Sequence, residues 1–357
     1  MSDDNNARLG VLETVSKYRP QIMGFAAMWI FIFHVRDEAL LFFHVPYINR
    51  IEIFFNNIGF CGVDVFLFLS GWGLYYALKK RNLNDFYKRR YRRLIPPFVL
   101  VCVVKALFEN WEFMKFFRAV TCWSFFAEYI HIPIWFIPAI AVIYLFYPLY
   151  NKAFDKFSNK YIFTAASLML WFALAFAGMI LFNREDVFGF VNRIPVFIVG
   201  VLFGWMAYNR KKIPGKAAAA VIFLMLIGGF QLQYYCTFRN LKLLFPLSNS
   251  SLPAFLIGIS MCFASAYCFK LLGKVKVIQK VYGFMGEMTL ELYAAQEIVM
   301  NILRSKNIYP GALIEKHLYA LLIFLFSLGG GYLLHLLMTM VFNKLDGKPV
   351  FTSKTAK

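Results

Sequence analysis

Apolar stretches of about 20 residues alternate with short polar segments along nearly the whole chain. An α-helix rises about 1.5 Å per residue, so a stretch of this length can cross the roughly 30 Å hydrocarbon core of a bilayer. The pattern predicts an all-α polytopic membrane protein with about ten transmembrane helices. We place them at residues 21–40, 57–78, 94–111, 133–152, 162–182, 190–207, 217–236, 252–271, 283–303 and 318–342. Residues 115–130 are too short and interrupted to span, and they predict an interfacial helix or a re-entrant segment.

The composition agrees with this pattern. Hydrophobic residues make up 60% of the 357 residues and charged residues only 16%. Soluble domains have roughly 45–50% apolar and about 25% charged residues, so the soluble class is excluded. Residues 1–18 are polar, and no small-residue cleavage pattern follows the first apolar run. We therefore expect the first helix to be retained as a span.

The basic residues predict the orientation in the membrane. Of the 38 Lys and Arg residues, 26 fall in the segments that include both termini and every second loop, and 11 fall in the other loops. The positive-inside rule then places both termini in the cytoplasm. Residues 1–20 form a cytoplasmic segment, 21–342 the transmembrane domain and 343–357 a basic cytoplasmic tail. Topology and anionic lipid explain the formal charge of +19 without nucleic acid as a partner.

The cysteines are scattered and form no CxxC pair, so we predict neither a metal site nor a disulfide framework. We interpret them as small apolar packing residues. They are Cys61, Cys102, Cys122, Cys236, Cys262 and Cys268.

The first apolar helix ends in a histidine, in the stretch "GFAAMWIFIFHVRDE". An ionisable residue in a span indicates function by default, although His34 could equally be a polar residue at the outer interface. On the order of 20 Å of helix separates His34 from Arg19 at the cytoplasmic end. The two residues are thus placed to contact the two ends of one extended ligand.

The second helix, "GFCGVDVFLFLSGWGLYYAL", carries Asp64 and Ser70. Small residues at 70, 71 and 73 could serve helix packing alone. A carboxylate on an apolar helix, however, needs a partner. We expect His34 on the neighbouring helix to be that partner, because a carboxylate fixes the tautomer of an imidazole and raises its basicity.

Two further groups of charged residues need an explanation. The stretch "FYKRRYRRLIPPF" could be a topological stop signal, but Arg90 and Arg93 share a helix face and would form a clamp for phosphate. Arg193 opens a span on the outer side. In "FMGEMTLELYAAQEIV", Glu287 and Glu291 lie four apart and predict a helix face that lines a polar cavity.

In order along the chain, these segments resemble the motifs of acyltransferase family 3, membrane proteins of bacteria that O-acylate glycans and lipid-linked sugars. The resemblance covers about residues 15–340. It is carried by His34; Gly62, Val63, Asp64, Phe66, Ser70 and Gly71; Arg90, Arg93 and Pro96; Trp135, Tyr144 and Pro148; Arg193, Pro195, Phe197 and Gly200; and Gly286, Thr289, Leu290, Glu291 and Tyr293.

Two positions depart from the family pattern. The family's first arginine is replaced by Met23, and Arg19 lies four residues earlier. Either Arg19 contacts the same ligand from deeper in the cytoplasm, or residues 88–93 have taken over its role. Gln296 stands where the family usually has histidine, which argues for a hydrogen-bonding role and against a proton shuttle.

The resemblance implies an enzyme of the acyltransferase class that transfers groups other than amino-acyl groups. It would move an acyl group, most often acetyl, from cytoplasmic acyl-CoA to a hydroxyl of a cell-surface glycan or lipid-linked saccharide. His34, oriented by Asp64, would act as general base or transient acyl acceptor, and Arg19, Arg90 and Arg93 would bind acyl-CoA. The residues left to bind the acceptor or line its cavity are Ser70, Trp135, Tyr144, Arg193, Glu287, Glu291, Tyr293 and Gln296.

The same resemblance places the protein in the cytoplasmic (inner) membrane of a bacterium, with acyl-CoA as cosubstrate and no permanently bound cofactor. The chain ends about 15 residues after its last predicted span. We therefore expect it to act alone, to pass its acyl group to a separate partner, or to modify a lipid-linked saccharide. The oligomeric state, homo-oligomers included, is left open. The alternatives are a transporter or flippase of a lipid-linked saccharide and a non-catalytic assembly scaffold.

Overall fold

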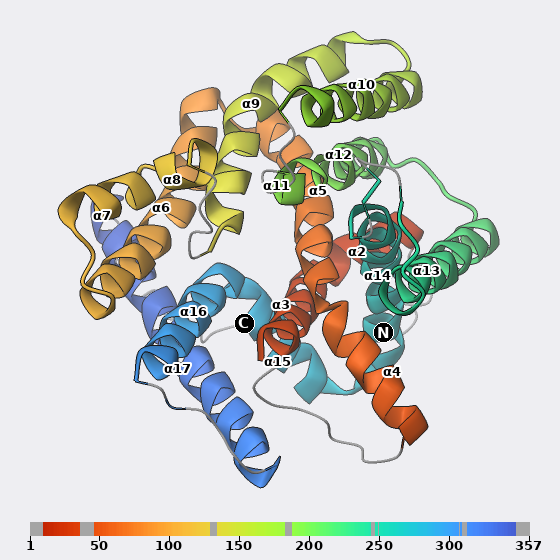
Figure 1. Ribbon diagram of the computed structural model, residues 1–357. Helices are drawn as coiled ribbons and strands as arrows, with labels where there is room; N and C mark the ends of the chain where they lie inside the picture. The colour runs from red at the N-terminus through yellow and green to blue at the C-terminus, as the bar shows by residue number, and fades with distance from the viewer. Residues whose placement is uncertain are drawn as a thin grey trace. The chain divides into compact units, whose positions relative to one another are not determined.

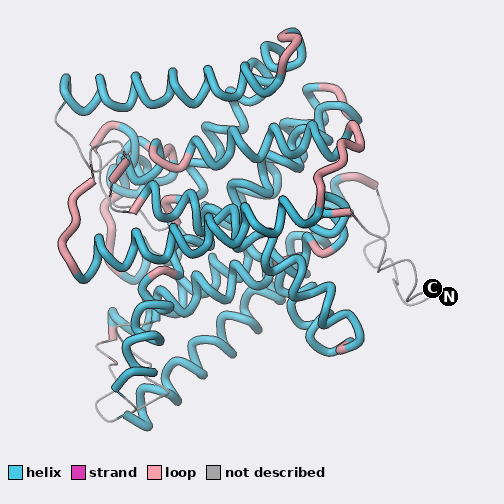
Figure 2. Tube along the Cα trace, turned by 90° about the vertical axis from the view of Figure 1, so that its right-hand side faces the viewer, coloured by secondary structure: helices cyan, strands magenta, loops and turns pink. Residues whose placement is uncertain are grey.

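The computed structural model describes residues 10–35, 46–128, 134–182, 188–243, 247–248, 250–306, 308 and 313–347, and every regular element in these ranges is a helix (Figures 1 and 2). The all-α prediction is confirmed for this part of the chain. The helices are α2 (Val11–Lys17), α3 (Arg19–Val35), α4 (Pro46–Asn57), η1 (Gly59–Cys61), α5 (Gly62–Lys80), α6 (Leu83–Phe108), α7 (Phe113–Val120), α8 (Trp123–Phe126), α9 (Phe136–Lys156), α10 (Lys160–Phe182), α11 (Phe188–Val191), α12 (Ile194–Tyr208), α13 (Gly215–Phe238), α14 (Ser251–Leu271), η2 (Leu272–Lys274), α15 (Lys276–Glu287), α16 (Thr289–Ser305) and α17 (Leu313–Leu345).

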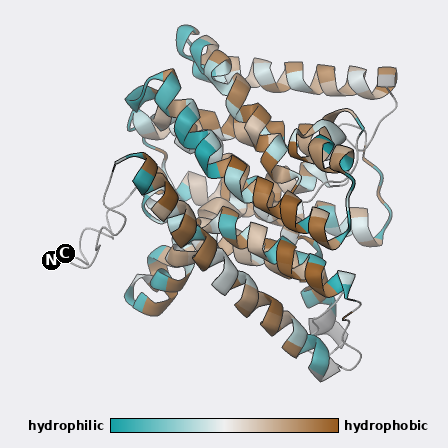
Figure 3. Ribbon diagram, turned by 90° about the vertical axis from the view of Figure 1, so that its left-hand side faces the viewer, coloured by the Kyte–Doolittle hydropathy of each residue, from teal (hydrophilic) through white to brown (hydrophobic). Residues whose placement is uncertain are grey.

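Six helical segments of the described chain are long and apolar enough to cross a membrane. They are Arg50–Lys80, Phe136–Lys156, Lys160–Leu181, Gly215–Phe238, Ser251–Lys274 and Glu315–Leu345. Figure 3 shows the hydrophobic colouring that runs along such helices. Each of the six coincides with a predicted span, and the protein is a membrane protein. The number ten stays a prediction, because only these six described segments are long and apolar enough. The orientation also stays a prediction, and residues 1–9 and 348–357 lie outside the described residues.

The other four predicted spans differ from the six for separate reasons. Helix α3 has 17 described residues and α12 has 15, so both are short. Helix α6 begins at Leu83, before the predicted start at 94, and carries the basic stretch in its first half; Pro96 and Pro97 lie inside it and do not begin it. The predicted span 283–303 is not one helix, because α15 ends at Glu287 and α16 begins at Thr289.

The described part of the predicted segment 115–130 forms short helices and no span, and its place at the membrane interface stays a prediction. Helices α7 and α8 have eight and four residues, and Cys122 joins them with a φ of 61°, in the left-handed region. Phe113, Phe117 and Trp123 are exposed. These aromatic side chains suit the interface between lipid and water.

The chain forms two compact units. Unit 1 comprises Met1–Arg36, Leu41–Arg89 and Ala139–Glu287, and unit 2 comprises Asp37–Leu40, Arg90–Pro138 and Met288–Lys357. Among the described helices, unit 1 holds α2–α5 and α10–α15 entire, and unit 2 holds α7, α8, α16 and α17.

Unit 1 is built around two pairs of helices that meet through glycines. Helices α5 and α12 run parallel, and a Cβ at Gly200 would collide with the carbonyl oxygen of Phe68, while one at Gly204 would lie 2.6 Å from the carbonyl oxygen of Trp72. Helices α3 and α15 meet through Gly24 and Gly286, where a Cβ would again strike backbone. Small residues of this kind let membrane helices pack backbone against backbone.

Candidate functional site

A buried ion pair joins the beginnings of α5 and α12. Asp64 lies in the first turn of α5 and is 1% exposed, and Arg193 is the residue before α12. Arg193 Nη1 donates to Asp64 Oδ2, and the guanidinium lies 5.6 Å from the ring centre of Phe60. The α14 backbone at Gly258 packs directly against Asp64. The positive end of the α5 dipole and the arginine together compensate a charge that would be very costly alone.

His34 lies at the same end of unit 1. It occupies the last turn of α3 and is half-buried. Phe33, its neighbour, has its ring centre 5.7 Å from that of Phe60, whose ring contacts Arg193. Helices α3 and α5 are antiparallel, because Gly62 at the start of α5 packs against Ala26 of α3, while Gly73 further along α5 lies against Arg19 at the start of α3. The partner that the structure gives Asp64 is Arg193, and the pairing of Asp64 with His34 stays a prediction.

Arg19 contacts α5 further along the same helix pair. Its Nη2 donates to the carbonyl oxygen of Leu69 at 2.8 Å, and its guanidinium fills the space that a side chain at Gly73 would take. Ser70 follows Leu69 and is half-buried. Arg19 and Ser70, both predicted site residues, are thus close together, whereas Arg19 and His34 lie at opposite ends of α3.

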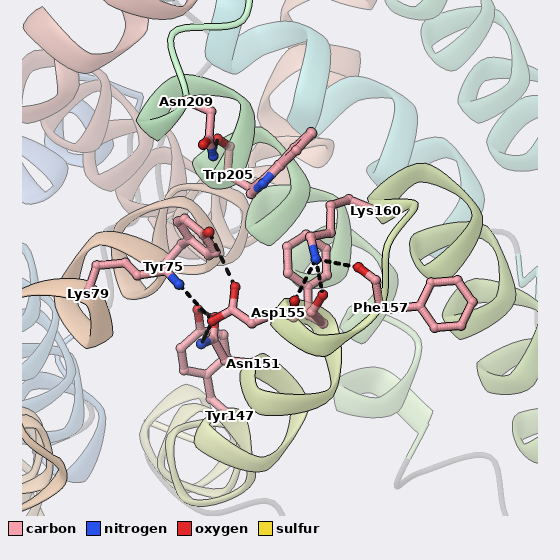
Figure 4. Close-up of polar contacts among 10 residues, drawn as sticks. Tyr75, Lys79, Tyr147, Asn151, Asp155, Phe157, Lys160, Trp205 and Asn209 are labelled. Carbon is pink, nitrogen blue, oxygen red and sulfur yellow. Dashed lines mark hydrogen bonds and ion pairs between the residues drawn. The ribbon is translucent and has the colours of Figure 1, made fainter.

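A polar cluster connects the C-terminal ends of α5 and α9, and sequence reasoning missed it (Figure 4). Asp155 accepts from Lys79 Nζ at 2.8 Å, from Asn151 Nδ2 at 2.9 Å and from Tyr75 OH at 3.4 Å. Lys160 donates to three carbonyl oxygens at the end of α9. It thereby supplies hydrogen bonds that the last turn of α9 cannot make within the helix. These contacts hold the helix ends together and leave the basic side chains around them at the surface.

The basic stretch of α6 belongs to unit 2 from Arg90 onward. Arg90 is half-buried and Arg93 exposed, three residues apart on one face, as the spacing predicts. Arg92 Nη1 donates to Asp346 Oδ1 at 2.6 Å, which joins this stretch to the end of α17. Pro96 and Pro97 lack the N–H groups that would bond the carbonyls of Arg92 and Arg93 in the helix. Phosphate binding by Arg90 and Arg93 stays a prediction.

Unit 2 also contains a carboxylate–histidine pair. Glu291 of α16 is 5% exposed, and its Oε1 lies 3.2 Å from Nδ1 of His335 on α17. Arg93 interacts electrostatically with Glu291. We did not single out His335 from the sequence, although the run "GGGYLLH" at 329–335, a histidine after three glycines inside an apolar helix, was a usable signal.

The remaining predicted residues are placed as follows. Gln296 is 3% exposed, with its Nε2 3.6 Å from Met300 Sδ, and Tyr293 is half-buried. Tyr144 is buried in α9, and Trp135 is half-buried just before that helix. The prediction that Glu287 and Glu291 share a helix face is wrong, because the break at Met288 puts them in different helices and different units.

Burial raises the pKa of the Cys122 thiol to about 11, which keeps it in its unreactive protonated form at neutral pH. Within the described ranges, no three His, Cys, Asp or Glu side chains are grouped so as to hold a metal ion.

Comparison with known proteins identifies the family. A family model described as an acyltransferase domain (acyltransferase family 3) matches residues 23–336. The chain is also similar to the O-acetyltransferase OatA of Staphylococcus aureus, with 25% identity over 254 residues in strains NCTC 8325 / PS 47, COL and MRSA252. That alignment covers 60% of this chain but only 39% of these relatives. No solved structure matches the chain. Since the family model extends over most of its length, this protein belongs to acyltransferase family 3.

Proposed function

We propose that this protein is a membrane O-acetyltransferase that moves an acetyl group from cytoplasmic acetyl-CoA to a hydroxyl of a glycan or lipid-linked saccharide. One observation carries the proposal: His34 lies at the same end of unit 1 as the buried Asp64–Arg193 pair. Family membership and the similarity to an O-acetyltransferase support it. The protein would lie in the inner membrane of a bacterium, with ten spans and both termini in the cytoplasm.

The residues at this end suit acyl transfer. His34 takes the proton of the attacking hydroxyl, or accepts the acyl group transiently through its ring nitrogen. The positive charge of Arg193, held in place by the buried carboxylate, stabilises the negative charge that develops on the acyl oxygen in the transition state.

The length of α3 suits a CoA donor. Fifteen residues of helix separate Arg19 from His34, which corresponds to about 22 Å at about 1.5 Å per residue. In this proposal the phosphates of CoA bind at basic residues near the cytoplasm, with Arg19 in unit 1 and Arg90 and Arg93 in unit 2 as the candidates. The thin, uncharged pantetheine arm then extends along the helix pair and brings the acyl carbon to His34.

The test is transfer of label from acetyl-labelled acetyl-CoA in membranes that express the protein. We expect label in a lipid-extractable or polymeric saccharide fraction with the wild type, and none with His34→Ala. His317→Ala, a histidine of α17, is the matched control and should retain transfer. Transfer that persists in His34→Ala would refute the role of His34. A wild type that transfers no label, but moves a lipid-linked saccharide across the bilayer, would favour the transporter alternative.

A further inference from the structure

The glycine-rich contact between α16 and α17 brings a histidine onto a buried carboxylate. A Cβ at Gly331 would lie 2.9 Å from the Cα of Leu292, so the two backbones nearly touch there. His335 follows Gly331 by one turn and faces Glu291, with Nδ1 3.2 Å from Oε1. Figure 1 shows α16 and α17 side by side.

This contact indicates which ring nitrogen of the neutral His335 carries the proton. A neutral histidine whose Nδ1 faces a carboxylate carries its proton on Nδ1, which leaves the lone pair on Nε2. Among the described residues, His335 makes no hydrogen bond other than that to Glu291, and its side chain is 34% exposed. Nε2 is therefore a basic nitrogen with room for a ligand.

The Glu291 carboxylate can accept a further hydrogen bond. Oε2 of Glu291 is buried and has no hydrogen-bond partner in the described part of the chain. A buried carboxylate oxygen rarely stays unpaired, so this atom points to a ligand that donates a hydrogen bond. The nearby Arg93 already balances the charge of Glu291, which favours a neutral donor such as a hydroxyl over a cation.

The position of the pair in unit 2 fits a reaction with acyl-CoA. His335 lies ten residues before the end of α17 at Leu345, or about 15 Å along the helix. The Arg92–Asp346 contact attaches the basic stretch of α6 to that same end. A donor whose phosphates bind near Arg90 can therefore extend its arm toward the pair from one side.

We infer that His335, oriented by Glu291, is a second catalytic histidine, the general base that activates the acceptor hydroxyl. The inference rests on the proposed function. His335 Nε2 takes the proton as the hydroxyl oxygen bonds to the acyl carbon, and the carbon–sulfur bond then breaks. The CoA thiolate leaves and takes up the proton from the imidazolium, so that an ester and CoA thiol are the products.

The simpler explanation is that the Glu291–His335 pair only holds α16 and α17 together. Enzyme kinetics distinguish this structural role from a catalytic one. We expect His335→Ala to lower kcat for transfer from acetyl-CoA by on the order of 10²–10⁴-fold, with an unchanged KM for acetyl-CoA. Imidazole added to His335→Ala should restore part of the rate, and the acidic limb of the pH–rate profile should be lost. Glu291→Gln should lower kcat less. His317→Ala on α17 and Glu297→Gln on α16 are the controls, and both should behave as the wild type.

A second measurement does not depend on activity. Diethyl pyrocarbonate modifies neutral, accessible imidazole, and mass spectrometry reports the rate at each histidine. We expect His335 of the purified wild type to react, because its side chain is 34% exposed and the Nδ1 contact with Glu291 leaves the lone pair on Nε2.

The outcomes are distinguishable. If the wild type transfers acetyl and His335→Ala keeps its kcat and pH profile, the inference is wrong while the proposed function stands. Protection of His335 from diethyl pyrocarbonate would also overturn the inference. A wild type without any acetyl transfer would overturn the proposed function, and the assignment of a general base with it.

Discussion

The buried Asp64–Arg193 pair allows a quantitative prediction. The side chains are 1% and 12% exposed, so both charges are largely removed from water. Removing one partner leaves an uncompensated buried charge, which costs about 3–5 kcal/mol. Because about 1.4 kcal/mol corresponds to a factor of ten, Arg193→Met should lower the folded-to-unfolded ratio by roughly 10²–10⁴-fold. Asp64→Asn should cost less, since Arg193 also lies against the ring of Phe60.

The double variant Asp64→Asn/Arg193→Met removes both charges together. Replacing a buried ion pair by neutral groups is often nearly neutral, so most of the loss seen in Arg193→Met should be recovered. The two single variants and the double variant form a thermodynamic cycle, and the thermal unfolding of detergent-purified protein measures it.

The chain offers a matched control for this cycle. The Arg92–Asp346 pair has side chains that are 26% and 34% exposed, so Arg92→Met should cost only about 0–1 kcal/mol. If Arg193→Met is no more destabilising than Arg92→Met, or if the double variant is as unstable as Arg193→Met, the reasoning from burial is refuted.

Three further predictions concern other contacts. Gly73→Leu should displace the guanidinium of Arg19 and raise the KM for acetyl-CoA severalfold with little change in thermal stability; an unchanged KM would contradict a role of Arg19 in donor binding. Asp155→Ala removes the acceptor of three hydrogen bonds and should lower the free energy of unfolding by about 1–3 kcal/mol, which thermal denaturation can check. Gly286→Ala forces a methyl group against an α3 carbonyl and should destabilise by about 1–3 kcal/mol, whereas Gly215→Ala, with open space around it, should not; equal melting midpoints would count against the close helix contact.

The sequence predicts those parts of the fold that depend on hydropathy alone. Six long apolar helices lie where the pattern places them, because lipid requires a continuous apolar stretch with internal hydrogen bonds. The predicted span at 283–303 is divided into two helices, because the backbone leaves the helix at Met288. Hydropathy averaged over about 20 residues does not register a break of a single residue.

The pairing of charged residues was harder to predict. Asp64 was correctly expected to need a partner, but the partner that the structure shows, Arg193, lies 129 residues away. Glu291 and His335 are 44 residues apart and meet through the close approach at Gly331. Residue types indicate which groups need compensation, whereas the packing of helices decides which group provides it.

The shortness of α12 has a consequence for how an acceptor reaches the Asp64–Arg193 pair. Fifteen residues of helix span about 22 Å, while the hydrocarbon core is roughly 30 Å thick. In the proposed orientation, with the basic residues 210–212 at the cytoplasmic surface and α12 along the membrane normal, Arg193 would lie about 8 Å below the outer boundary of the hydrocarbon core. The saccharide acceptor of the proposed function would then have to descend below the headgroups or meet a locally thinned bilayer, and a lipid anchor would hold it at that depth.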